Sequence, residues 1–227
     1  TPLTLPMNVQ LITKQGEQGE LPLSIPAERI GDQVTAAGIP FAIAKDGKNA
    51  LRLAGQTLTL KKDTRRLALL LSADSNRILD FTVGGKTVPC SVLSRTRRFA
   101  SWDLYDLHET AHIQEGQLGY VSTHSHNADG TDAIAKELYF YILILNVQGG
   151  DTVVLPRDEE TLVLAATELN TVAVPCATPL YDRVEDRPFD YTMRLGDKLR
   201  YLRMKLPWYM GDKGRYFSCY NRGRERE

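Results

Sequence analysis

Between about residues 33 and 175 the chain alternates short apolar runs with turn residues. This spacing is typical of β-sandwiches and barrels, and helical periodicity is scarce there. The plainest unit is Arg77–Val83, where apolar and polar residues alternate from position 79 onward, followed by Gly84–Gly85 and a return strand, Lys86–Val92. Two glycines supply the positive φ angles of a two-residue hairpin turn. Pro89 predicts that the return strand lies at a sheet edge or carries a bulge, because proline cannot donate to a β-ladder.

The same pattern predicts further strands along the chain. They are Pro40–Ala44, Gln56–Leu60, Arg66–Ser72, Gly119–Thr123, Leu138–Val147, Thr152–Leu155, Leu162–Ala166 and Thr171–Val174. The run from Leu138 is apolar on both faces, which predicts a central strand covered on both sides. Only Asp103–Gln114 looks helical, with a stripe from Leu104 to Ala111 and a stop near Gly116.

These elements predict an all-β, antiparallel β-sandwich with one short helix. Residues 1–30 are predicted as lead-in strands, 31–176 as the sandwich domain and 177–227 as a basic, aromatic C-terminal extension. At 227 residues the chain is long enough to bury a core without disulfides.

Charge argues against nucleic acid as a partner. The 28 basic residues balance the 28 acidic ones, whereas a nucleic-acid-binding chain needs a basic excess. Residues 178–227 hold 12 Lys or Arg against 8 Asp or Glu, and 9 of the 18 aromatic residues. Such a segment can bind a nucleic-acid strand, but packing on a neighbouring module is the favoured interpretation.

Three scattered cysteines, Cys90, Cys176 and Cys219, form no disulfide framework or metal spacing and predict a cytoplasmic, reducing location. No apolar run is long enough to cross a bilayer, so no membrane partner is expected. The chain begins at Thr1, without an initiator methionine, which suggests a processed chain or a segment of a longer protein.

All four histidines lie in one short window, at His108, His112, His124 and His126. On a helix His108 and His112 share a face, and on a strand His124 and His126 share a side, so together they offer four nitrogen ligands to zinc. Ordinary polar or half-buried histidines are the alternative.

Calcium is a second metal hypothesis for the same window. Asn127, Asp129, Thr131 and Asp132 alternate through a glycine-containing loop and offer hard oxygen ligands. The closing glutamate of a calcium loop is missing, and a plain polar turn is the alternative. No cofactor is required by the sequence, with zinc or calcium as optional ions.

A carbohydrate site is the third hypothesis. Trp102 and neighbouring aromatic residues form a candidate platform for a sugar ring, with Asp103, His124, His126 and Asp129 as hydroxyl partners. Core packing of these aromatic residues is the alternative. No nucleophile motif or phosphate-binding glycine loop is present, so no residue receives a catalytic role.

Four motifs occur along the chain in an order that indicates a family resemblance. They are Gly38–Ile43, Asn49–Leu60 with its Gly-Gln-Thr, Trp102-Asp103, and the His-x-His-x-x-Asp-Gly loop over Thr123–Gly130. Over roughly residues 30–175 the chain thereby resembles the C-terminal β-sandwich domain of bacterial α-mannosidase-like proteins of glycoside hydrolase family 38. That resemblance implies a galactose-binding-like jelly roll and membership of a carbohydrate-active protein. The family's zinc-binding His-x-Asp signature is absent here, which implies that the catalytic module lies elsewhere, in the same full-length chain.

Three functions remain open on this basis. The leading hypothesis is a non-catalytic accessory domain of an α-mannosidase-like glycoside hydrolase, which supports the catalytic module or contacts carbohydrate. The second is an independent carbohydrate-binding module. The third is a small metal-dependent sugar-processing enzyme built on the histidine cluster.

Overall fold

The computed structural model describes the backbone of residues 1–97, 100–105, 108–113 and 116–171, and the side chains of residues 1–97 and 116–171. Within these ranges every regular element is a β-strand, so the all-β prediction is confirmed. The chain divides into two units, Thr1–Trp102 with Ala111–Ala177 and Asp103–Thr110 with Thr178–Glu227. The sheets and the site described below belong to the first unit, except for the two-stranded sheet within residues 100–113, whose residues are divided between the two units.

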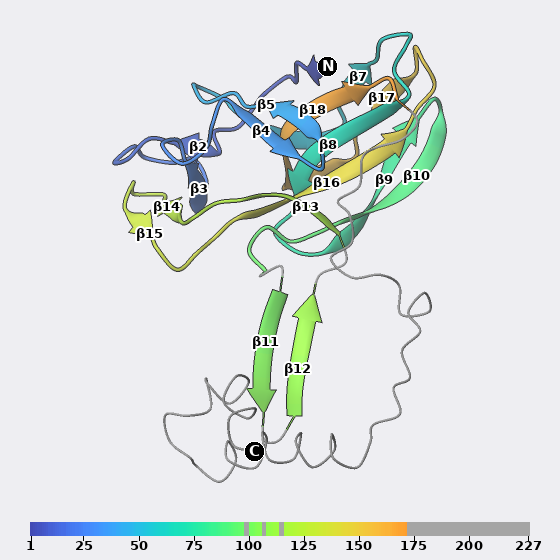
Figure 1. The fold of residues 1–227 in the computed structure, drawn as a ribbon. Coiled ribbons are helices and arrows are strands. Elements are labelled where there is room, and N and C mark those ends of the chain that lie inside the picture. The colour runs from blue at the N-terminus through green and yellow to red at the C-terminus, as the bar shows by residue number, and fades with distance from the viewer. Residues whose placement is uncertain (98–99, 106–107, 114–115, 172–227) are drawn as a thin grey trace, which may run out of the picture. The chain divides into compact units, whose positions relative to one another are not determined.

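The largest sheet has six strands, five of them in the order β1-β18-β8-β16-β13, with β6 also paired to β18 (Figure 1). All of these pairings are antiparallel. The strands are β1 (Pro2–Leu3), β6 (Leu51–Ala54), β8 (Arg66–Ser72), β13 (Gln117–Val121), β16 (Tyr139–Asn146) and β18 (Arg157–Leu169).

The second sheet has four strands in the order β10-β9-β17-β7. They are β7 (Thr57–Thr59), β9 (Arg77–Val83), β10 (Lys86–Val92) and β17 (Thr152–Val154). Val83 pairs with Lys86 across a two-residue turn in which Gly84 and Gly85 have φ of 53° and 80°. The predicted hairpin is confirmed, and β10 lies at the sheet edge, as Pro89 predicts.

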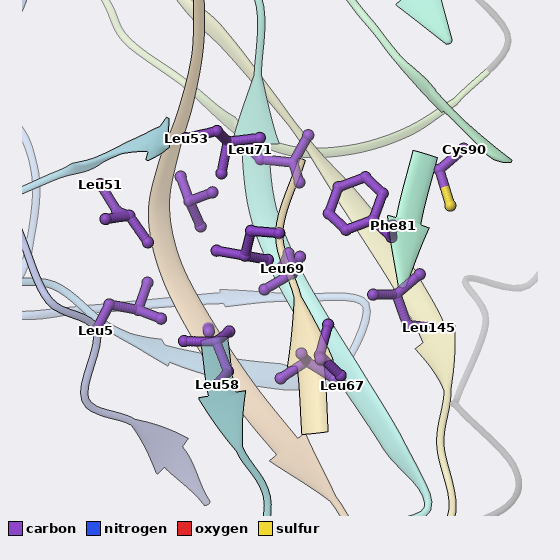
Figure 2. Close-up of a cluster of buried hydrophobic side chains, with 14 of the residues drawn as sticks. Leu5, Leu51, Leu53, Leu58, Leu67, Leu69, Leu71, Phe81, Cys90 and Leu145 are labelled. Atoms are coloured by element: carbon purple, nitrogen blue, oxygen red, sulfur yellow. The ribbon is translucent and has the colours of Figure 1, made fainter. Parts of the chain in front are cut away.

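The main core lies between these two sheets (Figure 2). Leu67, Leu69 and Leu71 point into it from β8, and Phe81 enters it from β9. Because strand side chains alternate between faces, β8 presents its odd-numbered residues to this core and its even-numbered residues to the opposite side. A β-sandwich results, with a closely packed apolar interior.

A second core covers the other face of the six-stranded sheet. Ala68 and Leu70 of β8 and Phe140 of β16 meet apolar residues from the first 43 positions of the chain, among them Leu11, Ile12, Ile25, Ile39 and Phe41. This explains why β8 and β16 carry apolar residues on both faces. The prediction that the strand starting near Leu138 is central is confirmed, since β16 lies between β8 and β13.

Residues 33–42 fold back as a separate hairpin, β4 (Gln33–Ala36) with β5 (Ile39–Ala42). Beside it, four very short strands form a sheet in the order β15-β14-β3-β2, here called the small sheet (Figure 1). They are β2 (Ile12–Thr13), β3 (Leu23–Pro26), β14 (Ser125–Asn127) and β15 (Asp132–Ala133). Residues 1–30, predicted as lead-in strands, thus supply β1, β2 and β3.

The predicted helix over Asp103–Gln114 is wrong. Strands β11 (Ala100–Tyr105) and β12 (His108–Ile113) occupy this region and form a two-stranded sheet. A spacing of four positions fits a helix and a strand alike, because residues four apart share a face in both. The aromatic and β-branched residues of this stretch, such as Trp102, Tyr105 and Ile113, favour strands.

Other predicted strands differ from the observed ones mainly at their ends. The strand at Leu162–Ala166 is the centre of the longer β18, and Gly119–Thr123 is observed as β13, two residues earlier. The strand predicted at Thr171–Val174 lies outside the described residues except for Thr171. In the part of the chain that the structure describes, no helix is long and apolar enough to span a membrane.

Candidate metal centre

His126 lies at the middle of the small sheet, opposite one residue on each neighbouring strand. It pairs with Ser24 of β3 on one side and with Asp132 of β15 on the other. Residues directly opposite in an antiparallel pair have Cβ atoms about 4.5–5.5 Å apart and point to the same face. The three polar side chains therefore form a row across this sheet.

His124 lies beside this row, in the bend just before β14 and two positions ahead of His126. The two imidazole rings lie with their centroids 5.7 Å apart at an interplanar angle of 59°. The sequence predicted neighbouring rings for a strand that holds both histidines, whereas the observed strand begins at Ser125.

Hydroxyl groups hold the Nδ1 atom of each ring. Thr13 Oγ1 is 3.0 Å from Nδ1 of His126 and 2.7 Å from Ser24 Oγ, and all three side chains are buried. Thr123 Oγ1 is 3.0 Å from Nδ1 of His124. Hydrogen bonds at Nδ1 fix the ring orientation and leave Nε2 as the atom that can bind a ligand.

Two carboxylates stand near the Nε2 atom of His126. Glu28 Oε1, from the turn after β3, is 3.3 Å away, and Asp132 Oδ1 is 3.6 Å away. Asp132 Oδ1 also lies 3.9 Å from Nε2 of His124. One ligand atom each from Glu28, His124 and His126 lies within 4.8 Å of the others, a spacing that can hold a metal ion.

The Nε2 atom of His126 is buried and has no hydrogen-bond partner. The side chain is 0% exposed, so water does not reach it. An unsatisfied buried polar atom costs about 1–3 kcal/mol, and native structures contain few of them. This atom therefore needs an explanation, which the two facing carboxylates alone do not provide.

The turn between β14 and β15 is held by its own polar groups. Asp129 Oδ1 accepts hydrogen bonds from the backbone N–H and the hydroxyl of Thr131, at 3.0 and 2.6 Å. The Thr131 hydroxyl bond and then its backbone N–H hold the pKa of Asp129 below its ordinary value. Asn127 Nδ2 donates to Thr131 Oγ1 at 3.0 Å. Two of the four residues proposed for calcium, Asp129 and Thr131, thus bond each other through their oxygens, and calcium binding stays a prediction.

A glycine contact ties this turn to the N-terminal segment. Gly130 has a φ of 84°, and a Cβ there would lie 2.7 Å from the carbonyl carbon of Gly16. The backbone N–H of Gly16 donates to the Gly130 carbonyl at 3.2 Å. Only glycine fits this close approach, which fixes the hairpin against the loop after β2.

The remaining predicted site residues divide by position. The side chains of Trp102, Asp103, His108 and His112 lie outside the described residues. His124, His126 and Asp132 come together, whereas Asn127 and Asp129 serve the turn beside them. His126 offers no exposed surface to a sugar, and the carbohydrate role of this set stays a prediction.

Sequence reasoning missed Glu28, Thr13 and Ser24. They lie about a hundred positions before the histidines and reach them through strands of two to four residues. Strands this short show no periodicity that a sequence pattern can reveal.

The comparison with protein families matches residues 1–172 to the AziU2-like beta-sandwich domain. The chain belongs to this family. The match includes both large sheets and the small sheet, and it supports the sandwich that the sequence resemblance implied. It gives no support to an affiliation with α-mannosidase-like glycoside hydrolases. A comparison with curated proteins finds no match.

Proposed function

We propose that this β-sandwich domain binds a divalent transition-metal ion, with Glu28, His124 and His126 as its protein ligands. The observation that carries the proposal is the buried Nε2 atom of His126, which has no hydrogen bond although a carboxylate oxygen lies 3.3 Å away. An ion bound to both His126 Nε2 and Glu28 Oε1 accounts for the missing hydrogen bond and for the short distance between these two atoms.

Protonation alone gives this atom no hydrogen bond. A doubly protonated ring would pair its charge with Glu28 and Asp132, but its Nε2–H would still lack an aligned acceptor. If Nδ1 carries the ring proton, Nε2 presents its lone pair to two carboxylate oxygens, which repel it. If Nε2 carries the proton, its N–H lacks an aligned acceptor. A cation bound to the Nε2 lone pair and to Glu28 removes the conflict in the first case, and Thr13 Oγ1 then accepts a hydrogen bond from the Nδ1–H group.

Distances and donor types favour a first-row ion such as zinc. Zinc–ligand bonds of about 2.0–2.1 Å in a tetrahedral site place neighbouring donors about 3.3 Å apart. His126 Nε2 and Glu28 Oε1 lie 3.3 Å apart. Two imidazoles with one carboxylate suit zinc, cobalt, nickel or iron, whereas calcium takes oxygen ligands.

Calorimetric titration of the chelator-treated full chain with zinc tests the proposal. We expect one ion per chain, and we expect Glu28→Gln to weaken zinc binding more than about 100-fold, since even changes to residues outside the ligands cost about 10–100-fold. Glu28 is 42% exposed, so this variant is expected to keep the fold. His126→Ala is the stronger variant, with circular dichroism as its check on folding.

The matched control is His108→Ala with His112→Ala. A site built on all four histidines predicts that this double variant weakens zinc binding as much as Glu28→Gln does. The site proposed here predicts unchanged affinity. Wild-type protein that takes up no zinc would refute the proposal.

A second candidate function is an accessory domain of an α-mannosidase-like glycoside hydrolase that supports a catalytic module or contacts carbohydrate. The observation that favours it is that the His-x-His-x-x-Asp-Gly motif of the resemblance forms β14 and its turn, on which Asp129 is exposed. Calorimetry with mannosides and galactosides tests it. Affinity lost in Asp129→Ala supports a carbohydrate role of this turn, and absence of heat with every sugar argues against carbohydrate contact.

A further inference from the structure

The side chains around the candidate ion are exposed to solvent on one side only. The side chain of His126 is 0% exposed and that of His124 is 16% exposed, whereas Asp132 and Glu28 are 39% and 42% exposed. The imidazole side of the centre is therefore closed by protein, and the carboxylate side faces solvent. A tetrahedral ion with three protein ligands has its fourth position on that open side.

Asp132 stands beside this position without belonging to the three-residue ligand set. Its Oδ1 lies 3.6 and 3.9 Å from the Nε2 atoms of His126 and His124. The same oxygen accepts a hydrogen bond from Gln15 Nε2 at 3.1 Å. Pairing of Asp132 with His126 across β15 and β14 fixes its backbone. It is thus an oriented acceptor next to the ion.

The charges of the ion, Glu28 and Asp132 limit the kind of molecule that can bind at the fourth position. A divalent ion with the Glu28 carboxylate has a net charge of +1, which attracts an oxygen ligand. The neighbouring Asp132 carboxylate repels a bare anion at close range but accepts a hydrogen bond from an O–H or N–H group. The best ligand therefore has an oxygen for the ion and an adjacent donor for Asp132.

We propose that the ion keeps an exchangeable position and takes there a small hydroxamate-like ligand, whose adjacent O–H or N–H group donates to Asp132. Water occupies the position when no such molecule is present. This inference rests on the proposed function, because it requires the ion. Asp132 acts as a positioning residue, since it holds the ligand's proton-bearing group rather than the metal.

Visible absorption of the cobalt-loaded full chain provides the test, with acetohydroxamate and acetate as probes. We expect acetohydroxamate to change the cobalt spectrum in a saturable way, and acetate to bind more than about 10-fold more weakly, because it has neither a second oxygen placed to chelate the ion well nor a donor for Asp132; 10-fold corresponds to about 1.4 kcal/mol. A cobalt spectrum that neither probe changes means that the protein closes all positions. That result overturns the inference and leaves the proposed function standing.

Asp132→Ala separates a positioning role from a ligand role. We expect this variant to keep a cobalt affinity within about 10-fold of wild type, the smallest cost usual for a residue outside the ligand set, and to lose about 10-fold of the preference for acetohydroxamate over acetate. Loss of cobalt binding as complete as in Glu28→Ala would make Asp132 a fourth protein ligand and would overturn the inference.

Asp80→Ala is the matched control, because Asp80 is an exposed aspartate on β9 of the four-stranded sheet. Both its cobalt affinity and its probe preference should equal those of wild type. Failure of the wild-type chain to bind cobalt or zinc at all would refute the proposed function itself, so the two failures are distinguishable.

Discussion

The sandwich and the small sheet are stabilised by different means. Strands of the two large sheets reach 13 residues and enclose a core of leucine, valine and phenylalanine side chains. The small sheet has strands of two to four residues, and its buried residues include Thr13, Ser24, Ser125 and His126. Apolar burial scales with area and requires no particular geometry, whereas buried polar groups stabilise only when each one has a partner.

This difference indicates where the molecule can respond to a ligand. The apolar core of the sandwich needs no ion, since its buried side chains pack against each other, although Arg52, Ser72 and Glu168 of the six-stranded sheet each have one buried polar atom without a hydrogen bond. The small sheet includes a buried nitrogen without a partner, so a bound ion completes it. Stability of the small sheet is therefore expected to depend on conditions that leave the sandwich unchanged.

The largest expected effect comes from Phe81→Ala. Phe81 is fully buried between the two large sheets, and its truncation leaves a cavity that costs about 3–5 kcal/mol in the free energy of unfolding. Denaturant unfolding measures this loss. Ile78→Ala, on the same strand at 74% exposure, should change it by less than about 0.5 kcal/mol. Equal effects of the two changes would contradict the core assignment.

Zinc is expected to have the next largest effect. At a free concentration of 100 times its Kd, a ligand of the folded state adds about 2.7 kcal/mol to stability. Amides that exchange by local opening should be slowed in β3 and β14 and unchanged in β9, whereas amides that exchange only by global unfolding should be slowed in both regions. Zinc that slows the locally opening amides of both regions equally, or that still slows them in Glu28→Gln, would contradict this view.

Thr13→Val is expected to have a smaller effect on stability than zinc. Valine preserves the shape of the side chain but removes the hydroxyl between Ser24 and His126, which costs about 1–2 kcal/mol for the groups left unpaired. Zinc affinity should fall about 10-fold because the imidazole loses its orienting bond. Thr59→Val, at an exposed position of β7, is the control for both measurements.

The smallest effect is a pH dependence at the turn. Because the pKa of Asp129 is lower in the folded state than in the unfolded chain, its stabilising contribution is present above the unfolded value and is lost as the pH falls through the folded value. Asp129→Asn should flatten this acidic part of a stability curve measured by denaturation at several pH values. A curve identical to wild type would show that the turn does not depend on the carboxylate.

Much of the sandwich was predictable because its strands are long enough to show a period. Arg66–Ser72, Arg77–Val83 and Lys86–Val92 have the predicted bounds, and alternation plus a Gly-Gly turn sets two of them. The region of β11 and β12 was mistaken for a helix because a four-residue spacing is compatible with both structures.

The site was predictable only in part, for a related reason. His124, His126 and Asp132 attract notice because they are close in sequence. Glu28 reaches them by tertiary folding, through a strand pair in which Asn127 lies opposite Leu23 and His126 opposite Ser24. Pairing between two short and distant segments leaves no signature in either one, so Thr13, Ser24 and Glu28 cannot be assigned to the site until the fold is known.

The burial of both faces of β8 affects how the register between this strand and its neighbours is determined. Both of its faces are buried, so a shift by one position would not expose an apolar side chain to water. The correct register must instead be determined by side-chain volume. Leucines at 67, 69 and 71 fill one side of the strand, and the smaller Ala68 and Ser72 flank Leu70 on the other. Exchanging Ala68 for leucine should therefore favour mispaired species during refolding, because it erases the size difference between the two sides.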